Sequence, residues 1–163
     1  MDISFTLADK GDLPPILLQL FPILRGNMTA IAPTGDSYEE DLRVWREYIL
    51  PALAEPSRQL VLMRRDGVLA GYFQYSLHGG TLVMEEIQIS PEHQGTGLFR
   101  SLYQWLAKTL PPSLTQAEAY AHKSNQKSQA ILEHLGLEKA GENPSGSSWH
   151  YLGSCQTLWE RVL

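Results

Sequence analysis

The chain has 163 residues, of which 43% are hydrophobic and 19% charged, with a formal net charge of −5 at pH 7. A globular chain of this length buries about 68–70% of its unfolded surface, so we predict one domain over residues 1–163 that needs neither a metal ion nor a disulfide. The acidic balance argues against a general nucleic-acid binder, and the apolar stretches are too short to span a membrane.

The chain has a single cysteine, Cys155, which rules out an internal disulfide. Its first residues show neither the basic nor the apolar region of a secretory signal. These two observations predict a reduced, cytoplasmic protein.

The first third of the chain predicts one strand and two helices. Alternating apolar residues over 3–7 are typical of a half-buried strand. Pro14 favours a helix start, and Pro22 is expected to kink or break that helix. A second helix is expected to begin near Asp36 or Ser37, with a glutamate three positions after Ser37 as in a capping box. Its apolar stripe extends to Leu53, and Pro51 and Pro56 close the segment.

The remainder predicts a sheet interrupted by two helices. Strands are expected over 59–64, 68–77, 81–90, 114–122, 137–140 and 147–152, and helices over 98–110 and 124–135. The order is β-α-α-β-β-β-α-β-α-β-β, in which an antiparallel meander joins βαβ crossovers. We therefore predict an α+β fold, a three-layer α/β arrangement with a mixed sheet.

The segment after the third meander strand has the pattern of an anion-binding site. A strand ends at Pro91, a loop with Gly95 and Gly97 follows, and a helix begins at Leu98. Glycines allow close approach of a phosphate to the backbone, and a helix start presents free N–H groups. A purely structural turn would explain the two glycines equally well. The loop matches neither the P-loop nor the three-glycine dinucleotide motif.

Two motifs resemble those of the GCN5-related N-acetyltransferase (GNAT) family. Gln94-Gly95-Thr96-Gly97 is similar to the acetyl-CoA loop of that family, and Ile87–Pro91 is similar to its preceding strand. Asn125–Leu137 resembles its second signature, in which an asparagine opens a helix. The resemblance covers nearly the whole chain and implies a mostly antiparallel central sheet flanked by helices.

The resemblance also implies a set of residues that bind acetyl-CoA. The strand backbone would pair with the pantetheine arm, the loop N–H groups would wrap the pyrophosphate, and an asparagine and a serine of the second motif would contact the cofactor. These residues are Ile87, Gln88, Ile89, Gln94, Gly95, Thr96, Gly97, Leu98, Phe99, Arg100, Asn125 and Ser128. An ordinary helix cap is the alternative for Asn125.

The sequence departs from the family pattern at two positions. Phe99 stands where the family usually has glycine or alanine, so we expect either a displaced helix start or an outward-turned ring. Leu132 stands where many members have a tyrosine that protonates the leaving thiolate. Another group or water must then supply that proton, or the activity is weak or lost.

Acetyl transfer to an amine requires a proton acceptor, and Glu85 and Glu86 are the candidates. Successive strand residues face opposite sides. Glu86 is preferred for the cleft, because Glu85 shares a face with Ile87 and Ile89, although a bulge would reverse this parity. Surface ion pairs with Arg64 or Arg65 are the alternative. For the missing acid the candidates are Tyr120, His122, Tyr151 and Cys155, of which we select Tyr120.

In this fold the acceptor site lies between the first two helices and the later loops. Residues there that suit a cationic amine through carboxylate or cation–π contact are Tyr38, Glu39, Glu40, Asp41, Trp45, Tyr48, Tyr72, Tyr75 and Trp149. A solvated helix face explains Glu39–Asp41 equally well.

Together these features lead us to expect an acetyl-CoA-dependent N-acetyltransferase that acylates a primary amine, of a small molecule or a peptide, by direct attack in a ternary complex. We expect no metal, nucleic-acid or membrane partner, and the family suggests a homodimer formed through edge strands near Tyr151. The alternatives are a weak or inactive CoA-binding regulatory module of the same fold and a purely structural interaction domain.

Overall fold

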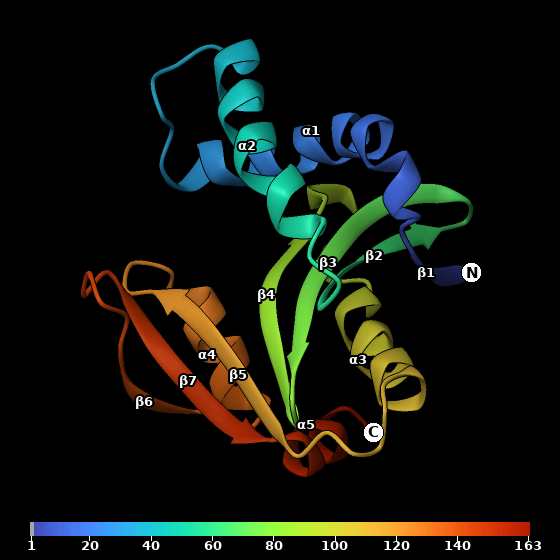
Figure 1. Cartoon of the computed structure of the whole chain (residues 1–163), viewed down its shortest axis with the longest axis vertical. Helices are drawn as coiled ribbons and strands as arrows, with labels where there is room; N and C mark the ends of the chain where they lie inside the picture. Colours follow the sequence, from blue (N-terminus) through green and yellow to red (C-terminus); the bar gives the residue numbers. More distant parts are fainter. Residues whose placement is uncertain (1) are drawn as a thin grey trace. The chain divides into compact units, whose positions relative to one another are not determined.

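A computed structural model describes residues 2–163 (Figure 1). Its strands are β1 (Ile3–Leu7), β2 (Arg58–Arg65), β3 (Val68–His78), β4 (Thr81–Ile89), β5 (Gln116–His122), β6 (Glu138–Glu142) and β7 (Ser148–Ser154). Its α-helices are α1 (Leu13–Ile31), α2 (Tyr38–Leu53), α3 (Leu98–Thr109), α4 (Gln126–His134) and α5 (Cys155–Val162), and 3₁₀ turns span Lys10–Asp12 and Pro91–His93. None of the helices in this range is long and apolar enough to cross a membrane.

The strands form one hydrogen-bonded sheet in the order β1-β2-β3-β4-β5-β7-β6. The chain divides into two compact units, and β3 and β4 contribute to both of them. The first unit contains the residues up to Gln74 together with Glu86–Leu98, and the second contains Tyr75–Glu85 and Phe99–Leu163. We describe each unit by itself.

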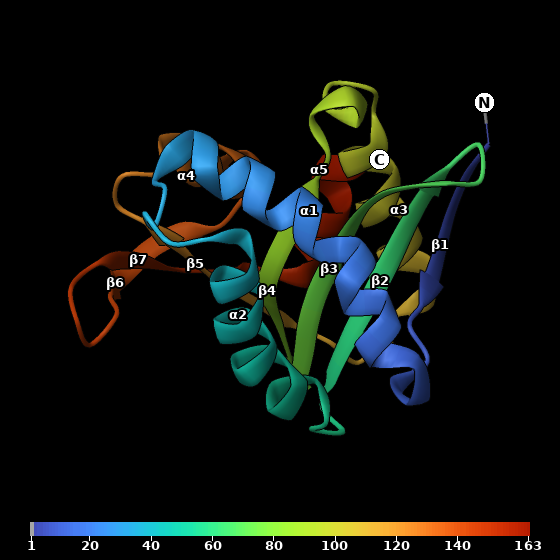
Figure 2. The same ribbon diagram turned by 90° about the horizontal axis from the view of Figure 1, so that it is seen from above.

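In the first unit, two helices cover one face of an antiparallel pair. β1 pairs with β2 from Ile3↔Arg65 to Leu7↔Val61. In Figures 1 and 2, α1 and α2 lie over β2 and β3 on the same side. The core between these elements consists of apolar side chains that include Leu17, Leu20, Phe21, Leu24, Ile49, Leu53, Leu60, Leu62 and Tyr72.

Of the two outcomes expected at Pro22, a kink or a break, the break is wrong, since α1 continues to Ile31. A proline inside a helix costs about 3 kcal/mol. Burial of a large apolar side chain contributes about 1.5–3 kcal/mol, and Leu17, Leu20, Phe21 and Leu24 are all buried around the ring. Their combined burial outweighs the proline.

α2 begins as predicted and ends at Leu53, the last residue of its predicted apolar stripe. Ser37 caps it by accepting a hydrogen bond from the Glu40 N–H at 3.1 Å. Pro51 does not end the helix, which continues to Leu53. Both Ile49 and Leu53 are buried, so packing again extends the helix past a proline.

The second unit is built on the β5–β7–β6 ladder, with α4 packed on β5 (Figure 1). β5 pairs in parallel with the first half of β4, from Thr81↔Gln116 to Met84↔Ala119. Its other edge pairs antiparallel with β7, which in turn pairs antiparallel with β6. The expected mixed, mostly antiparallel sheet flanked by helices is confirmed.

The predicted element order is confirmed through β7 but omits α5. Ser154 caps this last helix by accepting a hydrogen bond from the Thr157 N–H at 3.0 Å. Cys155, Leu158 and Val162 are buried along one stripe. The serine at the cap position and the helical spacing of the three buried residues would have allowed this helix to be predicted.

Candidate active site

The second half of β4 lies against β3 so closely that a side chain is excluded. A Cβ at Gly71 of β3 would come within 2.2 Å of the Gln88 carbonyl oxygen. The Ser90 N–H donates to the Ala70 carbonyl at 2.8 Å. The Gln88 carbonyl therefore faces β3. Because carbonyls alternate along a strand, those of Ile87 and Ile89 face the opposite edge of β4.

Polar side chains from α1, from β4 and from the loop after β4 form a connected chain of hydrogen bonds beside the second half of β4. Asn27 of α1 donates from Nδ2 to the Gln88 Oε1 and to the Ile89 carbonyl, both at 3.0 Å. Gln88 donates from Nε2 to the Glu86 Oε1 at 3.3 Å. Gln94 also donates to the Ile89 carbonyl, at 2.9 Å. This chain fixes Glu86 relative to α1 and to the start of the glycine loop.

Tyr72 of β3 is the second neighbour that matters for Glu86. Burial raises the pKa of the Tyr72 phenol well above its ordinary value, and the negative charge of Glu86 raises that pKa further. Tyr72 is 1% exposed. The phenol therefore remains protonated at neutral pH.

Glu86 forms part of the wall of a cavity of about 490 Å³ that α1 and α2 enclose. Most of the wall is apolar and comes from residues such as Phe21, Leu24, Met28, Val44, Trp45 and Tyr48. Arg25 and Asp41 also line it. A concave, mostly apolar site with a few convergent polar groups is the usual form of a small-molecule site.

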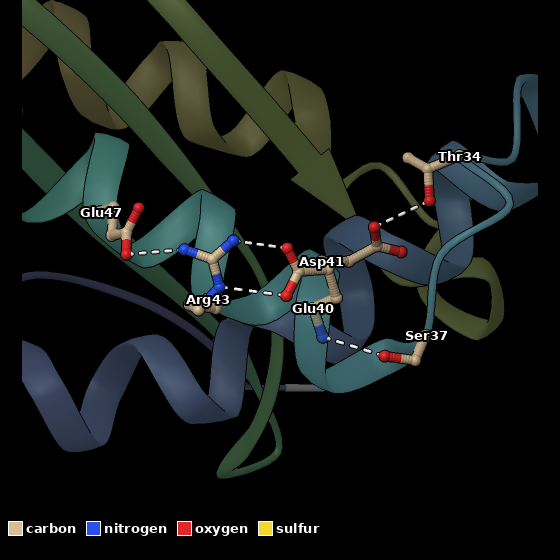
Figure 3. A network of polar contacts seen from close by, with 6 residues as sticks. All are labelled: Thr34, Ser37, Glu40, Asp41, Arg43 and Glu47. Atoms are coloured by element: carbon tan, nitrogen blue, oxygen red, sulfur yellow. Dashed lines mark hydrogen bonds and ion pairs between the residues drawn. The ribbon is translucent and has the colours of Figure 1, made fainter.

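Arg25 and Asp41 are bound to each other across α1 and α2. The Arg25 Nε lies 3.0 Å from the Asp41 Oδ2. Thr34 donates to the Asp41 Oδ1 at 2.7 Å (Figure 3). The hydrogen bond from Thr34, followed by that from Arg25, holds the pKa of the Asp41 carboxyl below its usual range. The Arg25 guanidinium also lies 5.3 Å from the centroid of the Tyr38 ring.

The glycine loop has the backbone geometry that the sequence pattern predicted. Gly95 and Gly97 have φ of +74° and +83°, and a Cβ at either position would meet no atom within 4 Å. Thr96 stabilises the loop by donating to the His93 carbonyl at 2.6 Å. α3 begins directly afterwards at Leu98. Open space beside glycines in front of a helix start is a geometry that accommodates phosphate.

In the second unit, Tyr120 lies on the exposed face of β5. It is 49% exposed and its ring stacks on His150 at 4.6 Å between centroids. Partial burial raises the pKa of the Tyr120 phenol, and Glu118 on the same face raises it further. Glu118 also lies 3.1 Å from the His150 Nε2. The phenol keeps its proton at neutral pH.

The other three candidates for the acid are held in different ways. Tyr151 is fully buried and donates to the Glu133 Oε1 at 3.4 Å. Cys155 is buried, which raises the pKa of its thiol, and it donates to the Gln116 carbonyl. His122 is exposed and hydrogen-bonded to Ser124 at 2.7 Å. Tyr120 and His122 are thus the accessible pair.

Asn125 acts as the cap of α4, the alternative considered for it. Its Oδ1 accepts the Ser128 N–H at 3.1 Å. The Nδ2 group is not used by that bond. Leu132, further along the same helix, is 9% exposed and cannot donate a proton.

At the start of α3, neither Phe99 nor Arg100 displaces the helix. The Phe99 ring packs along the helix on Tyr103, with centroids 4.7 Å apart. Arg100 donates from Nε to the Val162 carbonyl at 3.1 Å and also bonds to the Leu163 carbonyl. Its side chain is therefore held by the end of α5, and only its backbone remains for a cofactor.

The structure thus assigns the predicted residues to two groups. In the first unit, Glu86, Gln88, Ile89 and Gln94 are linked by hydrogen bonds, and the cavity wall joins Glu86 to Asp41, Trp45 and Tyr48. The second unit holds Glu85, Phe99, Arg100, Tyr120, Asn125, Ser128, Tyr75 and Trp149. The Nζ atoms of Lys123 and Lys139 lie 4.3 and 4.6 Å from the centroid of the Trp149 ring.

Sequence reasoning missed Asn27 and Arg25. Both lie on α1, which was interpreted only as an apolar helix. Their contacts reach Gln88 and Asp41, 61 and 16 positions away. The only local signal is that polar side chains appear near the carboxyl end of an otherwise apolar helix. No group of three metal-ligating side chains occurs within residues 2–163.

Comparison with solved structures finds the same fold in several acetyltransferases. The chain is 17% identical to an acetyltransferase from Thermus thermophilus, with a TM-score of 0.71 over 94% of this chain and 97% of that one. It is 14% identical to the PaiA N-acetyltransferase of Thermoplasma acidophilum in complex with coenzyme A, with a TM-score of 0.69 and coverage of 94% and 99%.

A third similar structure is the aminoglycoside acetyltransferase AAC(6')-Ib in complex with coenzyme A and kanamycin, 19% identical, with a TM-score of 0.67 and 98% coverage of both chains. No curated relative matches the sequence. The model of the acetyltransferase (GNAT) family matches residues 18–137. Because this match covers most of the chain, and because the fold agrees, the protein belongs to the acetyltransferase (GNAT) family.

Proposed function

We propose that this protein is an N-acetyltransferase that transfers an acetyl group from acetyl-CoA to a primary amine, with both units forming one acetyltransferase domain. The observation that carries the proposal is the Glu86 carboxylate in the wall of a cavity of about 490 Å³. Hydrogen bonds through Gln88, Asn27 and the Ile89 carbonyl link this carboxylate to Gln94 at the start of the glycine loop. One side of this arrangement suits a cation and the other suits a phosphate.

Glu86 would receive the proton that the amine must lose. An alkylammonium group has a pKa near ~10.4, so the neutral amine costs roughly 4–5 kcal/mol to populate at pH 7. A carboxylate within hydrogen-bond reach, or one water away, can take that proton. Gln88 holds Glu86 in place through a neutral amide, which leaves its negative charge intact.

The glycine loop and β4 fit a bound coenzyme. Bound acetyl-CoA would supply an acetyl group activated as a thioester. Backbone N–H groups of the loop and of the α3 start, from Gly95 to Arg100, would bind the pyrophosphate. The open edge of β4 would pair with the pantetheine arm through Ile87 and the Ile89 N–H, since the Ile89 carbonyl already accepts Asn27 and Gln94.

The second motif would complete coenzyme binding and supply the acid. Asn125 would donate from the Nδ2 group that its capping bond leaves unused, with Ser128 nearby on the same helix. Tyr120 would protonate the leaving thiolate, because its phenol is protonated at neutral pH and accessible. Glu85, on the β4 residue next to Glu86, is the reserve base.

The test is coenzyme binding followed by turnover. Saturation with acetyl-CoA at 100 times its dissociation constant should stabilise the protein by about 2.7 kcal/mol, measured as a rise in the unfolding midpoint. Gly97→Val should abolish this rise by filling the open space beside the loop. Amine-dependent release of CoA thiol should then identify acceptors.

The matched control is Gly67→Val. Gly67 has a φ of +78° and equally open surroundings, so this substitution imposes similar backbone strain in the β2–β3 turn. It should keep the acetyl-CoA response. Equal loss in both variants would contradict the placement of the cofactor loop. Coenzyme binding without thiol release from any amine would instead favour the regulatory module, for which buried Leu132 is the supporting observation.

A further inference from the structure

The cavity offers an acceptor a largely apolar surface. Met28, Val44 and Tyr48 line it and are 44%, 52% and 69% exposed. Exposed apolar side chains gathered around one concave site mark a binding surface. Phe21 and Trp45 also line the cavity, and their rings are in contact with centroids 5.3 Å apart and an interplanar angle of 31°. The body of the ligand that fits this wall is itself apolar.

The charges of the cavity are unevenly placed. Glu86 is a partly buried carboxylate in the β4 wall, held by the neutral amide of Gln88. The charge of Asp41 is balanced by its ion pair with Arg25, and Thr34 donates to its other oxygen. Asp36 also lines the cavity, but it lies in the exposed segment before α2, where water screens its charge.

Arg25 occupies the Asp41 carboxylate that a second ammonium in this cavity would otherwise contact. Its guanidinium is held by the Asp41 carboxylate at 3.0 Å, by the Asp36 carbonyl at 3.3 Å and by the Tyr38 ring. An ammonium placed beside it would meet a like charge whose own carboxylate partner is already engaged. Apolar walls would add a desolvation cost to that ammonium.

We propose that the cavity selects primary amines that carry one positive charge on an apolar body, and that Arg25 is the specificity residue that excludes a second charge. This inference rests on the proposed acetyl transfer and names the acceptor class for the same site. It separates this protein from an enzyme for polycations, such as the aminoglycoside acetyltransferase whose structure contains kanamycin.

A matched pair of acceptors tests the selectivity. Hexylamine and 1,6-diaminohexane share a six-carbon chain, and the diamine carries a second ammonium on the carbon that is the terminal methyl of hexylamine. We expect kcat/KM for acetylation to be about 10- to 100-fold higher for hexylamine, and kanamycin to be a poorer acceptor still. Equal values, or a preference for the diamine, would overturn the proposal.

Arg25→Met is the variant that should change this ratio. It removes the guanidinium and releases the Asp41 carboxylate, so the preference for hexylamine should fall at least about tenfold through a gain for the diamine. Arg43→Met is the control, because Arg43 pairs with Glu40 and Glu47 outside this cavity (Figure 3). A proportional loss with both amines in Arg25→Met would show a structural role only and overturn the assignment.

Asp41→Asn gives a second, opposite test should Arg25→Met fail to fold. It leaves the Arg25 charge without its carboxylate, so the preference for hexylamine should rise. A fall in the preference would contradict the role of Arg25.

Binding of the two amines in the absence of coenzyme, measured by titration calorimetry, separates this inference from the proposed function. Tighter binding of hexylamine with no thiol release from any amine would end the enzymatic proposal and support the selectivity. Acetyl-CoA turnover with indifferent amine binding would do the reverse.

Discussion

The two faces of α2 carry similar charges with different consequences. On one face, Arg43 bonds to Glu40 three positions before it and to Glu47 four positions after it. On the other, Asp41 bonds to Arg25 and Thr34, which belong to α1 and to the segment after it. Figure 3 shows the first set and the Thr34–Asp41 hydrogen bond of the second. The first set stays within one helix, whereas the second joins two elements.

The comparison teaches that residue type does not distinguish a surface charge from a site charge. Glu40 and Asp41 are consecutive acids in the first turn of α2, and both have a lowered pKa, Glu40 first through Arg43 and Asp41 first through Thr34. The Asp41 side chain is 15% exposed and that of Glu40 is 43% exposed. Only the contact with α1 makes Asp41 part of the cavity.

The largest difference between the cavity and the solvent face should appear in catalysis. Glu86→Gln keeps the size of the side chain but removes the proton acceptor, so kcat should fall by roughly 10²–10⁴-fold, measured as amine-dependent thiol release. Glu47→Gln removes an equally charged group from the solvent face and should leave kcat unchanged. An active Glu86→Gln enzyme would move the base to Glu85 or to water.

Stability should show the next largest contrast, between the two faces of α1. Leu20 is completely buried, so Leu20→Ala should lower the free energy of unfolding by about 2–5 kcal/mol. Leu18 is 49% exposed, and Leu18→Ala should change it by no more than about 0.5 kcal/mol. Chemical denaturation measures both. Similar losses would mean that α1 does not pack on β2 and β3 as described.

The cap of α2 should affect both faces by a smaller amount. Ser37→Ala removes the acceptor for the Glu40 N–H, and the expected loss is about 1 kcal/mol in the free energy of unfolding. Ser37→Asp retains an acceptor and should keep most of the stability. If alanine and aspartate behave alike in denaturation, the hydrogen bond contributes nothing.

The smallest expected effect is the acid sensitivity of the two charge sets. Both carboxyl groups have a folded pKa below the ordinary values of 3.8 for Asp41 and 4.5 for Glu40. Each therefore contributes stability above its unfolded pKa that is lost as the pH falls through the lower folded value. Asp41→Asn and Glu40→Gln should each flatten the fall of the unfolding midpoint in this acid range.

Salt distinguishes the two groups in the same experiment. Since Glu40 and Arg43 are more exposed than Asp41 and Arg25, high salt, about 1 M NaCl, should weaken the Glu40 contribution more. An equal response to salt would mean that the two faces of α2 are equally solvated.

The strands, the cap at Ser37 and the glycine loop were predictable because each depends on neighbours a few positions away. Alternation and helical spacing, together with positive-φ glycines before a helix, are properties of short segments. The continuation of α1 through Pro22 was not predictable in this way, because it depends on how many side chains the helix buries against β2 and β3.

The sequence alone determined the family and the element order through β7, since the motifs that resemble the family and the patterns of the elements are encoded in contiguous stretches. Tertiary structure decided the rest: which acids of α2 enter the cavity, that Asn27 and Gln88 hold Glu86, and that Arg25 occupies the cavity wall. Those contacts join residues up to 61 positions apart, and only the packing of α1 and α2 on the sheet brings them within hydrogen-bond distance.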